Sequence, residues 1–254
     1  MSTTAVAPLL SIEDVTLNFD GFLALRNLTL SIAPGELRFV IGPNGAGKTS
    51  LLDSITGKVR ATSGRVTFDG HDLIGRSPQD IAALGIGRKF QTPAVFPGHT
   101  VFDNMVLSLK SERGVLATLF RPMRPTYREE IFEILEIMGL SAEAQRPAGL
   151  LSHGQKQWLE LAMLMTQEPR LLLLDEPAAG MTGLERDQTV RLLETIAKDH
   201  TVLVIEHDME FVRRLAKTVT VLQAGSVLCE GTMAEVQANP TVVEVYLGRN
   251  EEVA

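Results

Sequence analysis

A length of 254 residues and a hydrophobic content of 44% suffice for one large domain, or two small ones, with a sizeable core. The 24 Lys and Arg against 31 Asp and Glu give a net charge of −7, so no overall positive field attracts nucleic acid, and we expect no nucleic acid partner. The single cysteine, Cys229, excludes an internal disulfide and fits a reducing compartment. No apolar run approaches the roughly 20 residues that span a bilayer, so we expect a cytoplasmic chain.

The first third of the chain carries strand patterns. In residues 15–19 and 28–32 alternate positions are apolar, and Phe19 shares a face with the apolar residues of the first segment. The short apolar run 37–42 predicts a buried strand, and after a glycine-rich loop 48–57 predicts a helix that Gly57 ends. The chain therefore opens with a small β layer and a strand, loop and helix unit.

Residues 65–91 continue with a strand, a turn, a helix and a strand. The stretch "RVTFDGHDL", 65–73, predicts a strand that runs into an Asp-Gly turn. In "SPQDIAALG", 77–85, Ser77 is expected to cap a short helix with proline at its first position. The stretch "IGRKFQ", 86–91, is the next candidate strand.

From 92 to 168 the strand signals give way to helical ones. Thr100 is expected to cap a helix over 101–110, and Thr126 with Glu129 to form a capping box before "IFEILEIMG". The prolines in 114–126 predict a loop. We interpret this part as an inserted helical subdomain.

Strands and helices alternate again from 170 to 217, as in a parallel sheet covered by helices. A hairpin over 219–231 and two short helices complete the chain. The expected fold is α/β: a parallel-sheet core, an N-terminal antiparallel β layer and an inserted helical subdomain. We expect a single domain, with 1–91 and 169–254 as the core and 92–168 as the helical part.

The stretch "GPNGAGKT" follows a predicted strand, precedes a predicted helix and fits a phosphate-binding loop. In such a loop the backbone N–H groups and the helix N-terminus face phosphate oxygens, Lys48 reaches the terminal phosphates and the Thr49 hydroxyl ligates Mg²⁺. An ordinary glycine-rich turn would need neither the lysine nor so many glycines. The nucleotide-binding residues are expected to be Gly42, Pro43, Asn44, Gly45, Ala46, Gly47, Lys48, Thr49 and Ser50.

Two further predicted strands end in ionisable residues. "LLLLDEP" places Asp175 to hold Mg²⁺ and Glu176 to orient or deprotonate a water. If the chain lacked Lys48, two solvated acids in a surface turn would be the better interpretation of this stretch. "VIEHDM" places His207 at a strand end, where a ligand in an open α/β sheet is expected. Gln91 also follows a strand and has a side chain suited to Mg²⁺ or water, but a glutamine there is commonplace, and both interpretations stay open.

The stretch "LSHGQKQWLEL" begins a predicted helix, with Ser152 as its cap and Gln155 completing a capping box. The free N–H groups there form a second anion site, and a side chain in place of Gly154 would block it. By itself the stretch is better explained as only a well-capped helix than as an anion site. His153 falls at the first helical residue, and we expect it to be neither a catalyst nor a defect.

In this order, "GPNGAGKT", Gln91, "LSHGQ", "LLLLDEP" and His207 resemble the ATP-binding subunit of an ABC transporter over nearly the whole chain. The resemblance implies a P-loop NTPase of the ABC ATPase fold that binds ATP and Mg²⁺ and hydrolyses ATP. It implies that Glu176 is the general base, His207 the switch histidine and Gln91 a Mg²⁺ ligand. It further implies that Phe19 stacks on adenine, and that the signature residues Ser152, Gly154 and Gln155 address the nucleotide of a second ATPase subunit.

Several stretches, including "VIEHDMEFV" and "NPTVVEVYLG", resemble the branched-chain amino acid and urea branch of these transporters, and "LSHGQKQWLEL" with "AAGMT" resembles the urea ATPases most. The expected solute is urea, with a branched-chain amino acid or another amide as the alternative. "AAGMTGLE" lacks the aspartate that usually ends this segment in the family, so no cross-subunit contact is carried over to it.

The resemblance implies the partners as well. They are a second ATPase, identical or paralogous, two integral-membrane permease subunits and an extracytoplasmic solute-binding protein, so the chain would lie peripherally on the inner face of the cell membrane. A soluble ABC ATPase that acts on nucleic acid or ribosomes would be expected to carry two cassettes or basic arms. A small-molecule kinase would have no reason to keep "LSHGQ".

Overall fold

The computed structural model describes residues 7–89, 94–109 and 125–244. The chain forms two compact units, which we call the core unit (1–88, 170–176 and 193–254) and the helical unit (89–169 and 177–192). The sequence-based boundary placed only 92–168 in the helical part. The structure adds 177–192, so the chain enters the helical unit twice.

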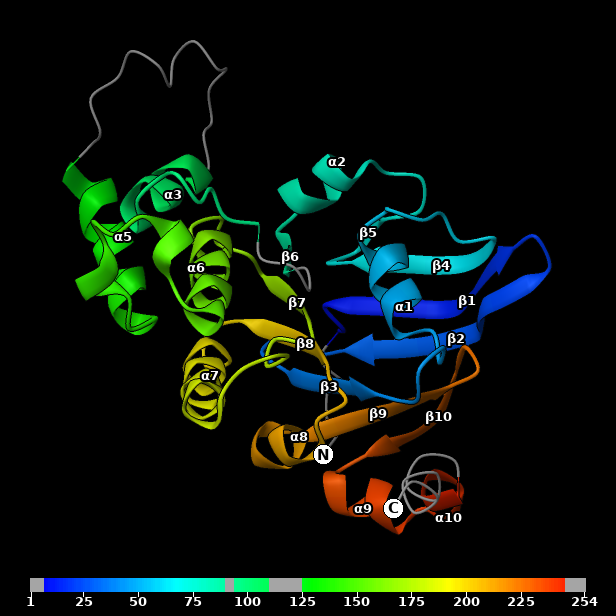
Figure 1. The fold of residues 1–254 in the computed structure, drawn as a ribbon. Coiled ribbons are helices and arrows are strands. Elements are labelled where there is room, and N and C mark those ends of the chain that lie inside the picture. The colour runs from blue at the N-terminus through cyan, green and yellow to red at the C-terminus, as the bar shows by residue number, and fades with distance from the viewer. Residues whose placement is uncertain (1–6, 90–93, 110–124, 245–254) are drawn as a thin grey trace, which may run out of the picture. The chain divides into compact units, whose positions relative to one another are not determined.

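The core unit begins with an antiparallel sheet of strand order β2-β1-β4-β5 (Figure 1). Its strands are β1 (Leu10–Phe19), β2 (Phe22–Ile32), β4 (Ser63–Phe68) and β5 (His71–Asp72). The turns at Asp20–Gly21 and Asp69–Gly70 have positive φ at both residues, which suits the twist of a tight hairpin. The predicted Asp-Gly turn is confirmed.

The second sheet has the order β10-β9-β3-β8-β7-β6. β3 pairs in parallel with β8 and β9, and β7 pairs in parallel with β8, whereas β10 is antiparallel to β9. Its strands are β3 (Leu37–Ile41), β6 (Ile86–Lys89), β7 (Leu171–Asp175), β8 (Thr201–Ile205), β9 (Thr218–Gln223) and β10 (Ser226–Gly231). Every residue of β3, β7 and β8 is buried, as expected for central parallel strands.

One hydrophobic cluster joins both sheets of the core unit to the first helix, through Leu51, Leu52 and Ile55. Apolar residues of the strands supply most of the rest of the cluster. The helices of the core unit are α1 (Lys48–Ile55), α2 (Pro78–Ala83), α8 (Met209–Leu215), α9 (Met233–Ala238) and α10 (Pro240–Val242). Ser77 caps α2 and Gly57 follows α1 with a φ of 69°, as the sequence predicts.

The helical unit holds α3 (Val101–Ser108), α5 (Pro125–Ile137), the short 3₁₀ turns η1 (Ser141–Glu143) and η2 (Ala148–Leu150), α6 (His153–Met165) and most of α7 (Gly183–Ile196). The capping box predicted with Thr126 is wrong, because α5 already begins at Pro125. The capping role of Thr100 is confirmed, with Asp103 as its partner. Most of the loop predicted at 114–126 lies outside the described residues.

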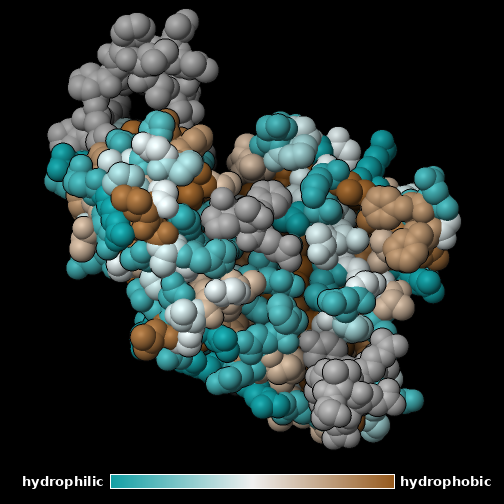
Figure 2. Space-filling view, viewed as in Figure 1, coloured by the Kyte–Doolittle hydropathy of each residue, from teal (hydrophilic) through white to brown (hydrophobic). Residues whose placement is uncertain are grey.

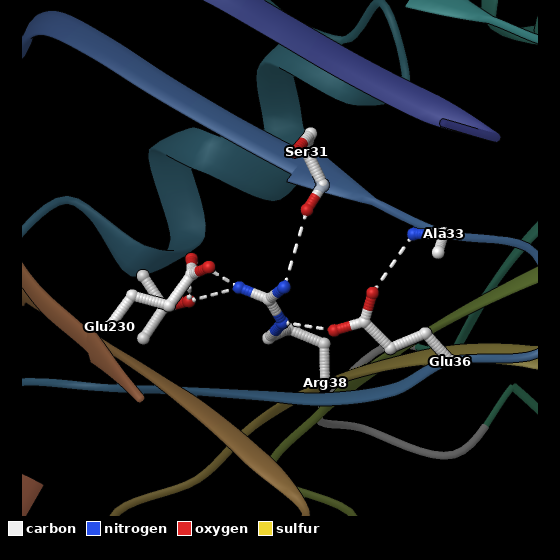
Figure 3. A network of polar contacts seen from close by, with 6 residues as sticks. Ser31, Ala33, Glu36, Arg38 and Glu230 are labelled. Atoms are coloured by element: carbon white, nitrogen blue, oxygen red, sulfur yellow. Dashed lines mark hydrogen bonds and ion pairs between the residues drawn. The ribbon is translucent and has the colours of Figure 1, made fainter. Parts of the chain in front are cut away.

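A network of polar side chains around Arg38 crosses the core unit (Figure 3). The guanidinium of Arg38 is buried, and it donates to the Glu36 and Glu230 carboxylates, to Thr220 Oγ1 at 2.8 Å and to Ser31 O at 3.3 Å. These partners lie on or beside β2, β3, β9 and β10. The network therefore joins the antiparallel sheet to the edge of the parallel one.

Two further points complete the fold. Phe19 does not share the buried face of β1. The pairing of β1 with β2 shifts register after Val15 and again after Leu17, and the Phe19 ring is left 46% exposed at the hairpin turn.

In the part of the chain that the structure describes, no helix is both long enough and apolar enough to cross a membrane.

Candidate functional site

The loop Gly42–Gly47 connects β3 to α1 in a conformation that glycine makes possible. Gly42, Gly45 and Gly47 have φ values of 156°, 79° and 101°, in the left-handed region that other residues rarely adopt. Gly47 is the residue before the first turn of α1, so the N–H groups of that turn are free to face an anion. The sequence-predicted order of strand, loop and helix is confirmed.

The outer side of this loop is packed against neighbouring backbone. A Cβ on Gly42 would lie 2.3 Å from Leu222 O, and one on Gly47 would lie 2.6 Å from Ala24 O. The Gly225 N–H, in the turn between β9 and β10, donates to Ala46 O at 3.0 Å. The loop is thus held in shape by β2 and the β9–β10 turn.

Lys48 begins α1 and folds back over the loop. Its Nζ donates to Gly42 O at 2.7 Å and to Pro43 O at 3.0 Å. Burial lowers the pKa of Lys48, and the negative charges of Glu176 and Asp175 oppose this shift. The ammonium therefore lies within electrostatic reach of both carboxylates.

Asp175 is the last residue of β7 and is buried. Burial raises the pKa of its carboxyl, which the Arg88 guanidinium opposes from 3.5 Å, and Glu176 and Asp53 raise it further. Arg88 also pairs with Asp53 of α1 at 2.6 Å, so one cation lies between two carboxylates. Sequence reasoning missed Arg88 because only the pairing of β6 beside β7 brings it to this place.

Glu176 and His207 meet at the carboxyl ends of β7 and β8. His207 Nδ1 lies 3.3 Å from Glu176 Oε1, and the imidazole is 58% exposed. Glu176 has a φ of 49°, a left-handed conformation that is rare for a residue with a side chain and clusters at functional sites. Its N–H donates to Ile205 O at 2.9 Å, which holds this bend against β8.

The acids on either side of His207 have structural roles. Glu206 is buried and accepts from the His207 N–H at 3.1 Å. Asp208 caps α8 by accepting from the N–H groups of Glu210 and Phe211. His207 is therefore the residue of this stretch whose side chain is directed at Glu176.

The remaining core-unit predictions have different outcomes. Asn44 is exposed in the loop, and in the first turn of α1 Thr49 is exposed and Ser50 is half-buried. Phe19 is exposed at the β1–β2 turn, so a face of its ring is open to a ligand. Gln91 lies outside the described residues, and its role stays a prediction.

The signature stretch lies in the helical unit. Ser152 caps α6, with Gln155 N–H donating to Ser152 Oγ at 3.1 Å and Ser152 N–H donating to Gln155 Oε1 at 3.0 Å. This capping box was predicted and is confirmed. The Gln155 side chain is thus engaged with its own helix.

The N-terminus of α6 also contacts the segment 178–185. Ser152 Oγ donates to Glu185 Oε1 at 2.7 Å, and a Cβ on Gly154 would lie 2.5 Å from the same oxygen. His153 Nε2 lies 3.2 Å from Ala179 O, so its ring packs onto this segment and does not point freely away from the helix. The sequence carried a signal for Glu185 as a capping residue, in "TGLE", but none for its contact with Ser152.

Comparisons with known proteins agree with this arrangement. The family model described as "ABC transporter" matches residues 25–179, and the model described as "Branched-chain amino acid ATP-binding cassette transporter" matches residues 226–252. The high-affinity branched-chain amino acid transport ATP-binding protein BraF of Pseudomonas aeruginosa is 34% identical over 252 residues, covering 95% of this chain and 98% of its own. LivG of Escherichia coli, with the same description, is 35% identical over 250 residues, covering 95% and 98%.

Solved structures show the same likeness. An ATP-binding cassette of an ABC transporter in an ADP conformation has a TM-score of 0.83 and 33% identity, covering 96% of this chain and all of its own. A nucleotide-free cassette has a TM-score of 0.81 and 33% identity, covering 94% and 99%. The chain belongs to the ATP-binding subunits of ABC transporters, of the branched-chain amino acid type, and is an ATPase whose hydrolysis of ATP is coupled to transport.

Proposed function

We propose that this chain is one of the two ATPase subunits of an importer for branched-chain amino acids. The observation that supports its catalytic part best is the 3.3 Å contact between His207 Nδ1 and Glu176 Oε1, at the sheet edge where the phosphate loop begins. Glu176 would accept a proton from the attacking water, and His207 would hold the Glu176 carboxylate and the terminal phosphate in place.

Lys48 has a defined step in this scheme. In the structure its ammonium is bound by the Gly42 and Pro43 carbonyls. When ATP enters, phosphate oxygens replace these carbonyls, and the N–H groups of the first turn of α1 donate to the same phosphates. Phe19 would stack on the adenine from the β1–β2 turn.

The residues present fit Mg²⁺. Asp175 is a buried carboxylate whose raised pKa shows that its charge is incompletely compensated, and a cation beside it would stabilise the ionised form. Mg²⁺ usually takes one or two protein oxygens, with phosphate and water supplying the others, so Asp175 and the Thr49 hydroxyl are a sufficient set, with Gln91 as a third. Bound there, Mg²⁺ would neutralise phosphate charge during transfer.

The signature residues are proposed to act on the nucleotide of the second ATPase. Ser152 Oγ and the Gly154 N–H lie at the N-terminus of a helix of 13 residues, where the helix dipole and the donors of the first turn favour an anion. Two chains arranged head to tail would each complete the other's site. The second chain is identical or paralogous.

The surface of the helical unit supports a membrane partner. Phe96, Leu107, Ile137 and Leu150 are each about half exposed or more, and Figure 2 shows brown side chains over α3 and α5. Exposed apolar residues gathered on one unit are typical of a protein contact. We assign these residues to the contact with the two permease subunits, which would receive solute from an extracytoplasmic binding protein and keep the chain on the inner face of the membrane.

The expectation from the sequence that the solute is urea needs revision. The likeness to urea ATPases gains no support from the relatives, because BraF and LivG are described as branched-chain amino acid transport proteins. The C-terminal family match also concerns that class. The proposal therefore adopts branched-chain amino acids, and urea becomes an alternative outcome of the test.

Replacement of the general base tests the catalytic role. Glu176→Gln should keep nucleotide binding and lower ATP turnover by roughly 100-fold or more, because the amide does not accept the proton of the attacking water. At saturating ATP it should also give a stable dimer in sedimentation, alone or with the ATPase that co-purifies with it. Lys48→Ala is the matched control, which should lose nucleotide binding and form no dimer. Wild-type turnover in Glu176→Gln would refute the role.

The same variant tests the solute. Cells with Glu176→Gln as their only copy should lose high-affinity uptake of labelled leucine while retaining their uptake of urea. Loss of urea uptake with leucine uptake unchanged would overturn the branched-chain assignment. Two alternatives from other protein classes, a small-molecule kinase and a soluble ABC ATPase, have no observation in their favour. Release of free phosphate from ATP would exclude the kinase. Co-purification of the chain with membrane proteins would exclude the soluble ATPase.

A further inference from the structure

One carboxylate joins the N-termini of two helices in the helical unit. Glu185 Oε1 accepts from Ser152 Oγ of the α6 cap at 2.7 Å, while Oε2 accepts from the Thr182 N–H at 3.0 Å and from Thr182 Oγ1 at 2.9 Å. Hydrogen bonds lower the pKa of Glu185, the Ser152 bond most, then those of the Thr182 N–H and hydroxyl and the Gly154 N–H. The Glu185 carboxylate is therefore an anion that accepts hydrogen bonds at the N-termini of both α6 and α7.

The Glu185 carboxylate occupies the same donors that are proposed to bind phosphate. Ser152 Oγ is already used by Glu185, and the carboxylate lies so close to Gly154 that a Cβ there would be 2.5 Å from Oε1 and 2.6 Å from the carboxylate carbon. A phosphate oxygen and a carboxylate oxygen do not share one donor pair at van der Waals distance, because both are negatively charged. The glycine leaves room for one anion at a time.

We propose that Glu185 is an internal competitor for the signature site, which must leave Ser152 and Gly154 before the phosphate of the partner's ATP binds there. This inference rests on the proposed function of the signature in trans. We call the bond between Glu185 and Ser152 the clasp. With the clasp closed, the chain lacks an available signature, so the subunits close only when phosphate displaces the carboxylate.

The clasp also connects the signature to the segment that follows the general base. Glu185 and Thr182 form the capping box of α7, and His153 Nε2 lies 3.2 Å from Ala179 O in the same segment. Release of Glu185 from Ser152 changes the contacts of residues 178–182, which begin two positions after Glu176 in the chain. Binding of phosphate at the signature thereby changes the contacts at the start of α7.

The chain itself supplies a variant that separates the clasp from the cap. In α3, Thr100 and Asp103 form a complete capping box, so aspartate is long enough for that role. Glu185→Asp should keep the cap of α7 and withdraw the carboxylate from Ser152 by about 1.5 Å, one carbon–carbon bond. Glu185→Gln removes the charge and keeps the length, but its amide has one acceptor oxygen where the carboxylate has two, so it cannot accept at both helix ends, and the neutral hydrogen bonds that remain are roughly half as strong.

The matched control is the capping box of α9. Glu235 Oε2 accepts from the Thr232 N–H at 2.7 Å and from its hydroxyl at 2.9 Å, and Glu235 N–H donates to Thr232 Oγ1 at 3.3 Å. The box of Thr182 and Glu185 has nearly the same distances, 3.0, 2.9 and 3.3 Å. Glu235→Asp therefore repeats the chemical change at a helix that carries no signature.

The experiment measures the ATP concentration at half-maximal dimer formation by sedimentation, in the Glu176→Gln background, alone and with the co-purifying ATPase. If the clasp is closed in about nine molecules of ten, opening it lowers this concentration up to roughly tenfold. Glu185→Asp and Glu185→Gln should each lower it by several-fold, and Glu235→Asp should not.

The outcomes separate the two proposals. An ATP requirement that stays unchanged or rises in both Glu185 variants, with the Glu176→Gln dimer intact, overturns the clasp. A Glu176→Gln protein that never dimerises with ATP overturns the signature in trans and so the proposed function. Melting curves of all variants identify a mere loss of stability, which would not lower the ATP requirement.

Discussion

At the scale of single residues, Arg38 is a buried charge that several hydrogen-bond partners hold in position. Its buried guanidinium donates to Glu36, Glu230 and Thr220, whose side chains come from three separate parts of the chain (Figure 3). Replacement by methionine would leave the Glu36 carboxylate with little exposure and no cation, whereas Glu230, which is 43% exposed, would turn to water.

Arg38→Met should therefore destabilise the chain by roughly 2–4 kcal/mol, at or below the usual cost of breaking a fully buried pair. Arg65→Met is the control, since the Arg65 and Asp72 side chains are 63% and 49% exposed at 3.5 Å, and such pairs contribute about 0–1 kcal/mol. Thermal unfolding of both variants checks this. Equal melting temperatures would show that the Arg38 network contributes no more than a surface pair.

At the scale of elements, one buried hydrogen bond joins α6 to α7. Trp158 Nε1 donates to Thr189 Oγ1 at 2.9 Å, with both residues buried. Thr189→Val keeps the shape of the side chain and removes the acceptor, so the indole N–H stays buried without a partner, at a cost of roughly 1–3 kcal/mol.

A double-mutant cycle isolates that bond. In a Trp158→Phe background the same Thr189→Val change should cost about 1 kcal/mol less, because no indole N–H remains to be left unpaired. Thermal unfolding of the four proteins gives the coupling. Additive effects of the two substitutions would show that the hydrogen bond does not stabilise this helix pair.

Elements were also the scale at which sequence reasoning was most successful. The Thr100 cap of α3, the capping box of α6 and the turn between β4 and β5 depend on residues within three positions of one another, so their chemistry is readable locally. The contact between Ser152 and Glu185 spans 33 positions and depends on how two helices pack. Phe19 was misjudged for a related reason, because the register shifts of β1 follow from its pairing with β2.

At the scale of the whole molecule, the proposed site is divided between the two units. Lys48, Asp175, Glu176 and His207 lie in the core unit, and Ser152 with Gly154 lies in the helical unit. ATP bound to a monomer should therefore protect the core unit alone, by about 2.7 kcal/mol at 100 times its dissociation constant. The signature helix should gain protection only in the dimer.

Hydrogen exchange of the Glu176→Gln protein with ATP checks this division. At a chain concentration where sedimentation shows monomer, the amides of α1 and the phosphate loop should slow, while those of the first turn of α6 should not. At a concentration where the dimer forms, both should slow. Protection of α6 in the monomer would mean that one chain completes the site by itself.

The hydrogen bonds of Lys48 to Gly42 O and Pro43 O have a thermodynamic consequence. Because the ammonium already has two acceptors, its own hydrogen bonds are exchanged when nucleotide enters, and the backbone that receives the phosphates is already held by β2 and the β9–β10 turn. Little conformational entropy is then lost on binding. We expect the two carbonyls to take up the lysine again when ADP leaves, so that each new ATP binds to the same ordered loop.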